Sequence, residues 1–196
     1  MQKKDKCRLC RRAGEKLFLK GEKCNLPSCP VARRAYGPGQ HRNQGKRFRR
    51  MSDYSLQLNE KQKARAIYGI SELQLLTYYK KARKVKGASG QKLMDLLESR
   101  IDNVIYRAGW ASTRSEARQI SVHGRVKINN KKTRSANILM KRGDKLEIVS
   151  IKESEKSDIP EWIKVTGKSL EVISSPVFDK GQSIINEQLI IEYYSR

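Results

Sequence analysis

The strongest constraint on the fold is a stretch in the middle of the chain that reads as two short helices followed by paired strands. Apolar residues within 97–108 recur with helical spacing, and Gly109 suits the left-handed residue that often follows a helix. Thr113 and Glu116 have the spacing of a capping box, which predicts a second helix over 114–123. Neither helix is long enough to bury its apolar stripe alone, so each needs a packing partner.

The residues after these helices supply that partner. Residues 125–129 and 145–149 alternate between apolar and polar side chains, as expected of half-buried strands. Asn129 and Asn130 can adopt the positive φ angles of a hairpin turn, and residues 141–144 read as a second turn. The stretch therefore predicts an α+β unit in which two helices pack on a small sheet.

Cationic and polar side chains follow the two helices. Arg100, Asn103 and Arg107 share one face of the first helix, and Arg114 and Arg118 lie one turn apart on the second. Such a face suits folded RNA, which proteins recognise by shape and by contacts to phosphates and 2′-hydroxyl groups. The alternative is a basic surface that is merely solvated, because this is the commoner meaning of clustered charge.

The charge of the whole chain favours a polyanionic partner. Its 196 residues carry a net charge of +23, with a pI of about 10.1. Residues 1–50 contain 16 Lys and Arg against 3 Asp and Glu, whereas residues 151–196 contain 6 against 8. No basic amphipathic anchor or long apolar run points to a membrane. Nucleic acid is therefore the expected partner, bound by the first 150 residues.

All four cysteines lie in the first 29 residues, as Cys7-x2-Cys10 and Cys24-x4-Cys29. Two close pairs can place four thiolates around one tetrahedral, structural zinc ion. An iron–sulfur cluster and redox-active thiols are the alternatives. Because no apolar segment precedes the first pair, no secretory signal is expected, and the cytoplasm, where disulfides are disfavoured, is the expected compartment.

Three parts are expected along the chain. Residues 1–45 form a zinc knuckle and an extended basic arm. Residues 46–95 form a helical subdomain, which the apolar C-terminal segment 184–196 completes. Residues 96–183 form the RNA-binding module with its two helices, small sheet and C-terminal extension. No Ser, His and Asp grouping and no complete phosphate-binding loop is found, so no enzymatic activity and no small-molecule substrate are expected.

Several segments resemble those of small-subunit ribosomal protein four, the uS-four family, in its bacterial and zinc-bearing form. The resemblance covers nearly the whole chain and is weakest over residues 152–183. It rests on residues 7–12, 17–24, 36–41, 52–54, 60–63, 67–72, 96–104 and 186–196.

The resemblance implies a structural constituent of the small ribosomal subunit that binds ribosomal RNA first and nucleates assembly of its 5′ domain. It also implies a place beside ribosomal protein five, on the path by which messenger RNA enters the subunit, and an effect on translational accuracy. Two other classes compete with it. One is a free RNA-binding assembly or stress factor, and the other is an RNA-modifying enzyme, for whose catalytic domain the chain has no room.

The resemblance further implies the site residues. Cys7, Cys10, Cys24 and Cys29 would hold one zinc ion. The matching positions for RNA contact are Arg8, Arg11, Arg12, Lys20, Lys23, Arg33, Arg34, Tyr36, Gln40, His41, Arg47, Arg49, Arg50, Lys61, Lys63, Arg65, Arg100, Asn103, Arg107, Thr113, Arg114, Arg118, Gln119, His123, Lys127, Asn129, Lys131 and Lys132.

Overall fold

The structure, a computed structural model, describes residues 5–34, 36–39, 52–85, 87–149, 159–176 and 184–195. The chain divides into two compact units, one of residues 1–72 with 184–196 and one of residues 73–183. This differs from the three expected parts, because residues 73–95 group with the predicted RNA-binding module. A hydrogen bond of 3.0 Å from the buried Arg100 guanidinium to the Tyr78 hydroxyl is one of the contacts that join them.

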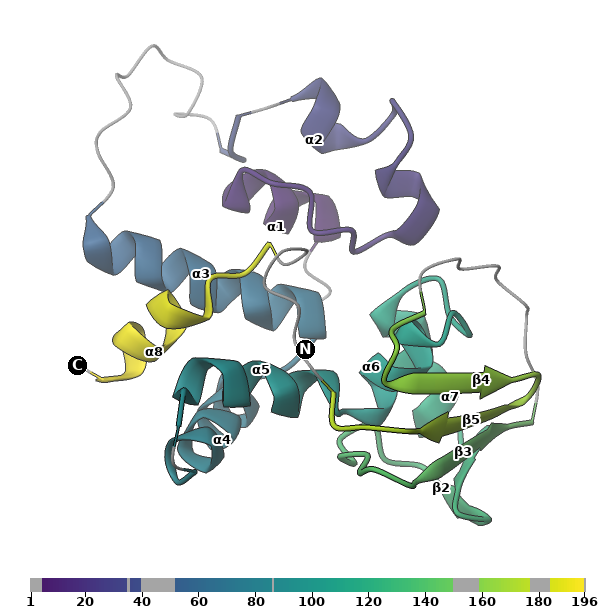
Figure 1. Cartoon of the computed structure of the whole chain (residues 1–196). Helices are drawn as coiled ribbons and strands as arrows, with labels where there is room; N and C mark the ends of the chain where they lie inside the picture. The colour runs from purple at the N-terminus through teal and green to yellow at the C-terminus, as the bar shows by residue number, and fades with distance from the viewer. Residues whose placement is uncertain are drawn as a thin grey trace. The chain divides into compact units, whose positions relative to one another are not determined.

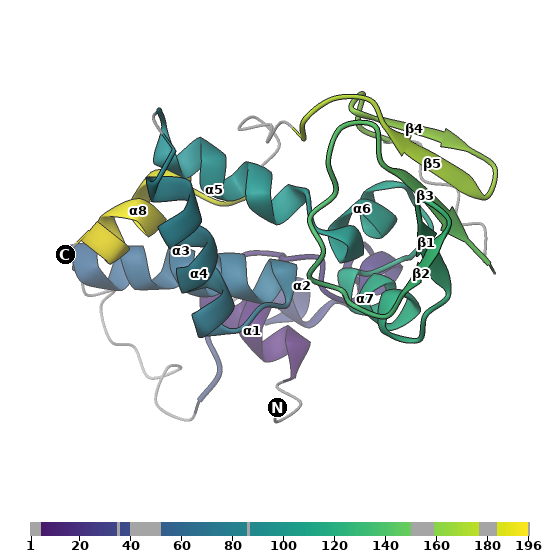
Figure 2. The ribbon, with the colours of Figure 1, turned by 90° about the horizontal axis from the view of Figure 1, so that it is seen from below.

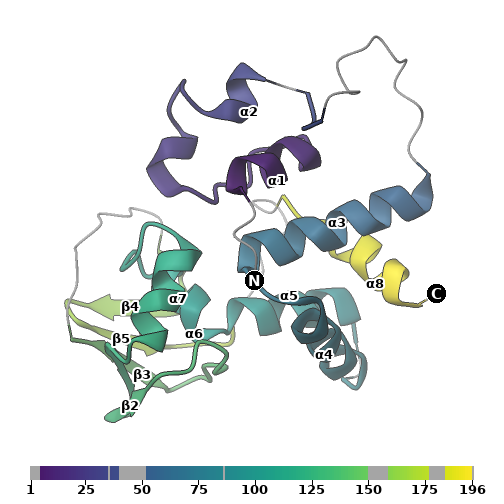
Figure 3. The ribbon, with the colours of Figure 1, turned by 180° about the vertical axis from the view of Figure 1, so that it is seen from behind.

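The first unit is helical (Figures 1 and 3). Its elements are α1 (Lys6–Ala13), the 3₁₀ helix η1 (Gly21–Cys24), α2 (Pro30–Arg33), α3 (Asp53–Tyr68) and α8 (Glu187–Ser195). The Ser52 hydroxyl accepts a hydrogen bond from the Ser55 amide and so caps α3, which ends at Gly69 with a φ of 62°.

The apolar C-terminal segment packs along α3 (Figure 3). Ile190 of α8 is fully buried. The Tyr194 hydroxyl donates to the Glu72 carboxylate over 2.8 Å, and the Gln57 amide donates to Glu192 over 3.1 Å. Polar contacts therefore flank a buried apolar side chain and fix how α8 lies on α3.

The second unit is a sheet covered on one face by helices (Figure 2). Its helices are α4 (Glu72–Arg83, whose first residue belongs to the first unit), α5 (Ser89–Glu98), α6 (Ile101–Arg107) and α7 (Arg114–Val122). Its strands are β1 (Val126–Ile128), β2 (Lys131–Thr133), β3 (Lys145–Ile148), β4 (Ile163–Thr166) and β5 (Ser169–Val172). The sheet is antiparallel throughout, in the order β2-β1-β3-β5-β4.

The core of this unit lies between α6, α7 and the covered sheet face. Ile105, Leu146 and Leu170 are fully buried there, together with Trp110 and Trp162, which serve as packing residues. The predicted hairpin is confirmed, since Asn129 and Asn130 have φ angles of 47° and 67°. The alternating pattern thus predicted β1 and β3 correctly, and the asparagine pair predicted the turn between β1 and β2.

The predicted continuous helix over 97–108 is wrong. The chain leaves helical geometry at Arg100, where ψ is 138°, and α6 starts afresh at Ile101. The Ile101 amide donates instead to the Ile138 carbonyl over 2.9 Å, and Arg100 forms a β-bridge with Leu139. A segment far along the chain therefore competes for the backbone and divides the helix. None of the helices in the described ranges is long and apolar enough to cross a membrane.

Candidate nucleic-acid interface

Helix α7 begins with the predicted capping box. The Glu116 amide donates to the Thr113 hydroxyl over 3.2 Å, and the Glu116 carboxylate accepts from the amide and hydroxyl of Ser112. The cap fixes where the first helical turn starts. It thereby sets the direction in which Arg114 and Arg118 leave the helix toward α6.

A buried carboxylate organises the surface where α6 meets α7. Glu98 is only 2% exposed, and it accepts hydrogen bonds from Arg107 Nε over 2.9 Å and Nη2 over 3.0 Å. Asn103 Nδ2 donates to the same carboxylate over 2.7 Å, while Asn103 Oδ1 accepts from Arg114 Nε over 2.7 Å. The Arg114 guanidinium also lies 4.4 Å from the centre of the Tyr106 ring. Both arginines are thus held from several sides.

A second buried ion pair lies at the break between α5 and α6. Arg100 is 0% exposed and forms a two-pronged contact with Asp102, at 3.0 Å and 2.6 Å. Burial by itself would lower the pKa of Arg100, but its bonds to Asp102 outweigh this and raise it. Arg118, whose side chain is 37% exposed, lies 3.6 Å from the same Asp102.

Burial argues against two of the predicted RNA contacts in this unit. Arg100 and Asn103 are buried and hydrogen-bonded inside the protein, so their side chains cannot reach an RNA in this conformation. They instead hold neighbouring groups in place. Arg107 and Arg118, which are about a third exposed, remain predicted contacts together with Arg114.

Several of the predicted RNA contacts of the unit lie on the β1–β2 hairpin and at the end of α7. His123, Lys127, Lys131 and Lys132 are all exposed, as an RNA contact requires. Gln119 and Asn129 are exposed near them in sequence, and Thr113 is half-buried as the helix cap. These positions stay predictions.

Gly124 allows the side chains of Lys132 and Arg134 to approach the end of α7. Its φ is +68°, and a Cβ built on it would lie 3.1 Å from both Arg134 Cγ and Lys132 Cε. Arg134 was missed from the sequence, as were the exposed Arg125, Lys141 and Arg142. A sequence signal was available for three of them, because Arg125 begins a predicted strand and Lys141 and Arg142 lie in the predicted turn.

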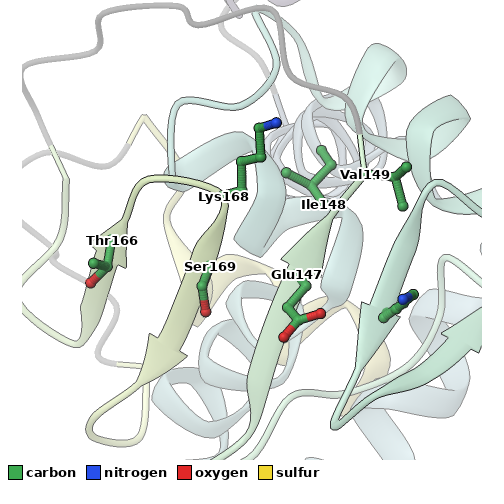
Figure 4. Close-up of a pocket in the computed structure, with 7 residues that line it drawn as sticks. Glu147, Ile148, Val149, Thr166, Lys168 and Ser169 are labelled. Atoms are coloured by element: carbon green, nitrogen blue, oxygen red, sulfur yellow. The ribbon is translucent and has the colours of Figure 1, made fainter.

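The open face of the sheet carries a shallow hollow of about 530 Å³ (Figure 4). Its lining includes Lys127 of β1, Glu147 of β3, Thr166 of β4, Ser169 of β5 and the turn residue Lys168. The register places Glu147 opposite both Lys127 and Ser169. Charges of both signs alternate across this face, so it is less positive than the hairpin.

Helix α3 does not present the predicted basic face. Lys61 and Lys63 are buried, with ion pairs of 3.0 Å to Glu72 and 2.6 Å to Glu60 respectively. Burial therefore argues against the predicted RNA contacts at these two lysines, because their ammonium groups are paired with carboxylates inside the first unit. Arg65 is 29% exposed and lies 3.1 Å from Glu72, and it remains a predicted contact.

Exposed cations surround the cysteine-containing segment. Those facing solvent are Arg8, Arg12, Lys20, Lys23, Arg33 and Arg34. Arg11 is half-buried, donates to the Tyr36 carbonyl over 3.1 Å and lies 5.0 Å from the centre of that ring. The predicted contacts at Gln40, His41, Arg47, Arg49 and Arg50 lie outside the described residues.

The four cysteines have the chemistry of a structural zinc site, and they lie close enough to influence one another. Cys10, Cys24 and Cys29 are buried, and Cys7 is half-buried. Burial raises the pKa of the Cys10 thiol, and repulsion from the other three raises it further. A hydrogen bond between Lys20 and Cys7 raises the pKa of that lysine. Across the described ranges, however, no three metal-binding side chains converge into a formed metal site.

Comparison with known proteins covers nearly the entire chain. Residues 2–98 match the ribosomal protein S4/S9 N-terminal domain, and residues 99–146 match the S4 domain. The small ribosomal subunit protein uS4A of Nitrosomonas europaea is 46% identical over 97% of both chains. The chain belongs to the uS4 family. Further uS4 relatives come from Syntrophomonas wolfei, 45% identical, and Dictyoglomus turgidum, 41% identical, each covering 97% of this chain and 96% of the relative.

The boundary between the two family matches falls inside the ion-pair network. Glu98 closes the first matched segment, whereas Arg107 and Arg114 lie in the second. The contacts from Glu98 therefore join the end of one matched segment to the start of the next, within a single structural unit of this uS4 protein.

Proposed function

We propose that this uS4 protein is a structural constituent of the small ribosomal subunit that binds its ribosomal RNA and catalyses no reaction. The observation that carries the proposal is the 46% identity to a small ribosomal subunit protein over 97% of both chains. The cytoplasmic ribosome is the corresponding location.

The exposed charges support RNA as the direct partner. The exposed cations of the N-terminal segment and of the β1–β2 hairpin form no ion pair with a carboxylate of the described residues, unlike Lys61 and Arg100. Free Lys and Arg side chains bind phosphates by releasing condensed counterions. Arg107, Arg114 and Arg118 add planar guanidinium groups, which suit bidentate contact with phosphate oxygens.

The finer parts of the proposal follow from the family resemblance. The protein would bind the 5′ domain of small-subunit ribosomal RNA early and nucleate its assembly. It would lie beside ribosomal protein five and on the path by which messenger RNA enters, and so affect translational accuracy. The two units, each with its own exposed cations, support simultaneous contact with several helices of a folded RNA.

Two measurements on the full-length protein test this function. After a high-salt wash, the protein should still sediment with small subunits on a sucrose gradient. The purified protein should also bind a 5′-domain ribosomal RNA fragment at least about a hundredfold more tightly than an unrelated structured RNA of equal length. Loss from the subunit together with equal affinity for both RNAs would instead favour a free RNA-binding factor.

We also propose that Cys7, Cys10, Cys24 and Cys29 hold one structural zinc ion. Four thiolates supply a complete tetrahedral donor set and leave no open position for catalysis. Little apolar surface is buried in this segment beyond Leu17, so the metal would supply stability that packing does not. The zinc ion would draw the four thiol groups into a closer arrangement and lower their pKa values.

Metal analysis of the purified protein tests the zinc proposal. We expect about one zinc ion per chain, lost in Cys24→Ser and kept in the exposed control Ser28→Ala. Less than about half an equivalent of zinc would reject the proposal. Visible absorbance with bound iron would favour the iron–sulfur alternative.

A further inference from the structure

Glu98 is an unusual residue for a surface that binds RNA. A carboxylate repels phosphate, and an isolated buried carboxylate is strongly unfavourable. Yet Glu98 lies at the end of α5 directly beneath two arginines that are predicted to contact RNA. A buried negative charge at this position therefore calls for a physical explanation.

The geometry shows what Glu98 holds. Its two carboxylate oxygens accept from Nε and Nη2 of Arg107, so the plane of that guanidinium is fixed. The Arg107 side chain is nevertheless 34% exposed, so part of it remains accessible to a ligand. A buried acid thus orients a cation that is partly open to solvent.

Glu98 reaches Arg114 through Asn103. By accepting from Asn103 Nδ2, the carboxylate leaves Asn103 Oδ1 directed to Arg114 Nε. The Tyr106 ring supports the same guanidinium by a cation–π contact, and Glu98 Oε1 lies 4.0 Å from Arg114 Nη2. One carboxylate thus sets the positions of two guanidinium groups that belong to different helices.

We propose that Glu98 is a positioning residue that determines specificity for folded RNA, an inference that rests on the proposed RNA-binding function. Holding Arg107 and Arg114 at a fixed spacing removes in advance the conformational entropy that long side chains otherwise lose on binding. That advantage exists only for an RNA whose phosphates match the spacing. The negative charge meanwhile weakens attraction to every RNA, and only a matched RNA recovers this loss through the positioned guanidinium groups.

Asp102 has a different role, although it also binds arginine. Its main partner, Arg100, is 0% exposed and cannot reach RNA, so that pair serves the fold. The main partner of Glu98 is partly exposed. This difference separates a positioning role for Glu98 from a purely structural one.

The test compares full-length wild type with Glu98→Gln on two probes, a 5′-domain small-subunit ribosomal RNA fragment and an unrelated RNA duplex of equal length. We expect affinity for the fragment to fall about tenfold. Affinity for the unrelated duplex should stay equal or rise, because one negative charge is lost. The exposed Glu161→Gln changes the net charge equally and should keep the wild-type ratio of the two affinities.

Each other outcome overturns the inference in a recognisable way. An unchanged ratio in Glu98→Gln means that the carboxylate does not determine specificity. If Glu98→Gln weakens binding to both probes equally and also lowers the melting temperature, then Glu98 has only a structural role. If wild type itself does not prefer the ribosomal fragment, the proposed function has failed rather than the role of Glu98.

A second variant keeps the test decisive if Glu98→Gln folds poorly. Arg107→Lys retains the positive charge but removes the planar guanidinium group that donates two hydrogen bonds to Glu98. It should lower the affinity ratio by a similar factor, and adding Glu98→Gln to it should lower the ratio little further. Fully additive effects of the two substitutions would show that Glu98 does not act through Arg107.

Discussion

Arg100 and Lys132 have the same formal charge but opposite environments. The first is buried against Asp102 and Tyr78, whereas the second is exposed on the β1–β2 hairpin. Burying a charge is costly unless a partner of opposite sign and good geometry accompanies it. Burial and ion pairing thus distinguish cations that stabilise the fold from exposed cations that remain available to RNA.

Removing the partner of Arg100 should destabilise the second unit. In Asp102→Asn the fully buried guanidinium keeps its hydrogen bonds to Tyr78 and Ala136 but loses its counter-charge. We expect the free energy of unfolding to fall by about 3 kcal/mol. Trp110 and Trp162 both lie in this unit, so urea unfolding followed by tryptophan fluorescence measures it.

Glu171→Gln is the matched control, because Glu171 is exposed on the open face of the sheet. It should change the free energy of unfolding by less than about 0.5 kcal/mol. Equal stability of Asp102→Asn and the control would contradict a structural role for the buried ion pair.

At the scale of elements, α8 and α3 are held together by a small set of polar contacts around Ile190. The hydroxyl of Tyr194 and the ammonium group of Lys61 both donate to Glu72. Lys61 also lies 4.0 Å from the centre of the Tyr193 ring. Such an arrangement depends on protonation states and therefore on pH.

The packing of α8 should weaken at both extremes of pH. Burial would raise the pKa of Glu72, but hydrogen bonds from Lys61 and Tyr194 outweigh it and lower the pKa. The stability from Glu72 is therefore complete above its ordinary pKa and is lost as the pH falls below about 4. Burial and the bond to Glu72 raise the pKa of Tyr194, so its contribution is lost as the pH rises above about 10.

The weakening of α8 packing can be measured by hydrogen exchange of the α8 backbone amides. The exchange is followed by mass spectrometry at several pH values and corrected for the intrinsic exchange rate. In Tyr194→Phe the protection should be lower than in wild type between about pH 6 and pH 9, and the difference should shrink toward both extremes. A difference that does not vary with pH would show that these ionisations are not linked to docking.

The β1–β2 hairpin and the residues that follow it carry the exposed cations Lys131, Lys132 and Arg134. Replacing Lys132 and Arg134 together by Gln should weaken binding to the ribosomal RNA fragment about tenfold, because each loses a phosphate contact. Stability should hardly change, since both side chains are exposed. Fluorescence anisotropy with a labelled fragment gives the affinity.

Lys164 and Lys168 provide the control for this pair, because β4 is the opposite edge of the sheet from β2. Replacing them by Gln removes the same charge and should weaken binding distinctly less. Equal loss in both double variants would mean that overall charge, rather than the hairpin surface, sets the affinity.

For the whole molecule, a net charge of +23 is the dominant property. The excess lies in the first 150 residues, and residues 151–196 contribute one strand pair and the helix that packs on α3. A surface of this charge needs a polyanion, and its binding must depend on salt.

Affinity for the ribosomal RNA fragment should fall by about a thousandfold or more between about 50 mM and 200 mM salt, as expected for six or more phosphate contacts. A salt titration by filter binding measures the slope. A change of less than about tenfold would contradict an interface in which phosphate contacts dominate.

Local features of the fold could be read from the sequence because they depend on neighbouring residues. The turn at Asn129 and Asn130, the cap at Thr113 and the end of a helix at Gly109 each follow from side chains within a few positions. The alternation of strand residues likewise identified which side chains face the core. Family membership was also recognisable, since it rests on the residues themselves.

The sequence alone could not separate buried from exposed cations, and only the tertiary structure decided this. Lys61 looked like an RNA contact because its partner, Glu72, comes from another helix. Arg100 pairs with the nearby Asp102, but the residues that help to bury it, Tyr78 and Ala136, come from distant segments. The break before Ile101 has the same origin, since a carbonyl 37 positions away takes its amide hydrogen bond. Charge and helical periodicity are local properties, whereas burial depends on which distant segments meet.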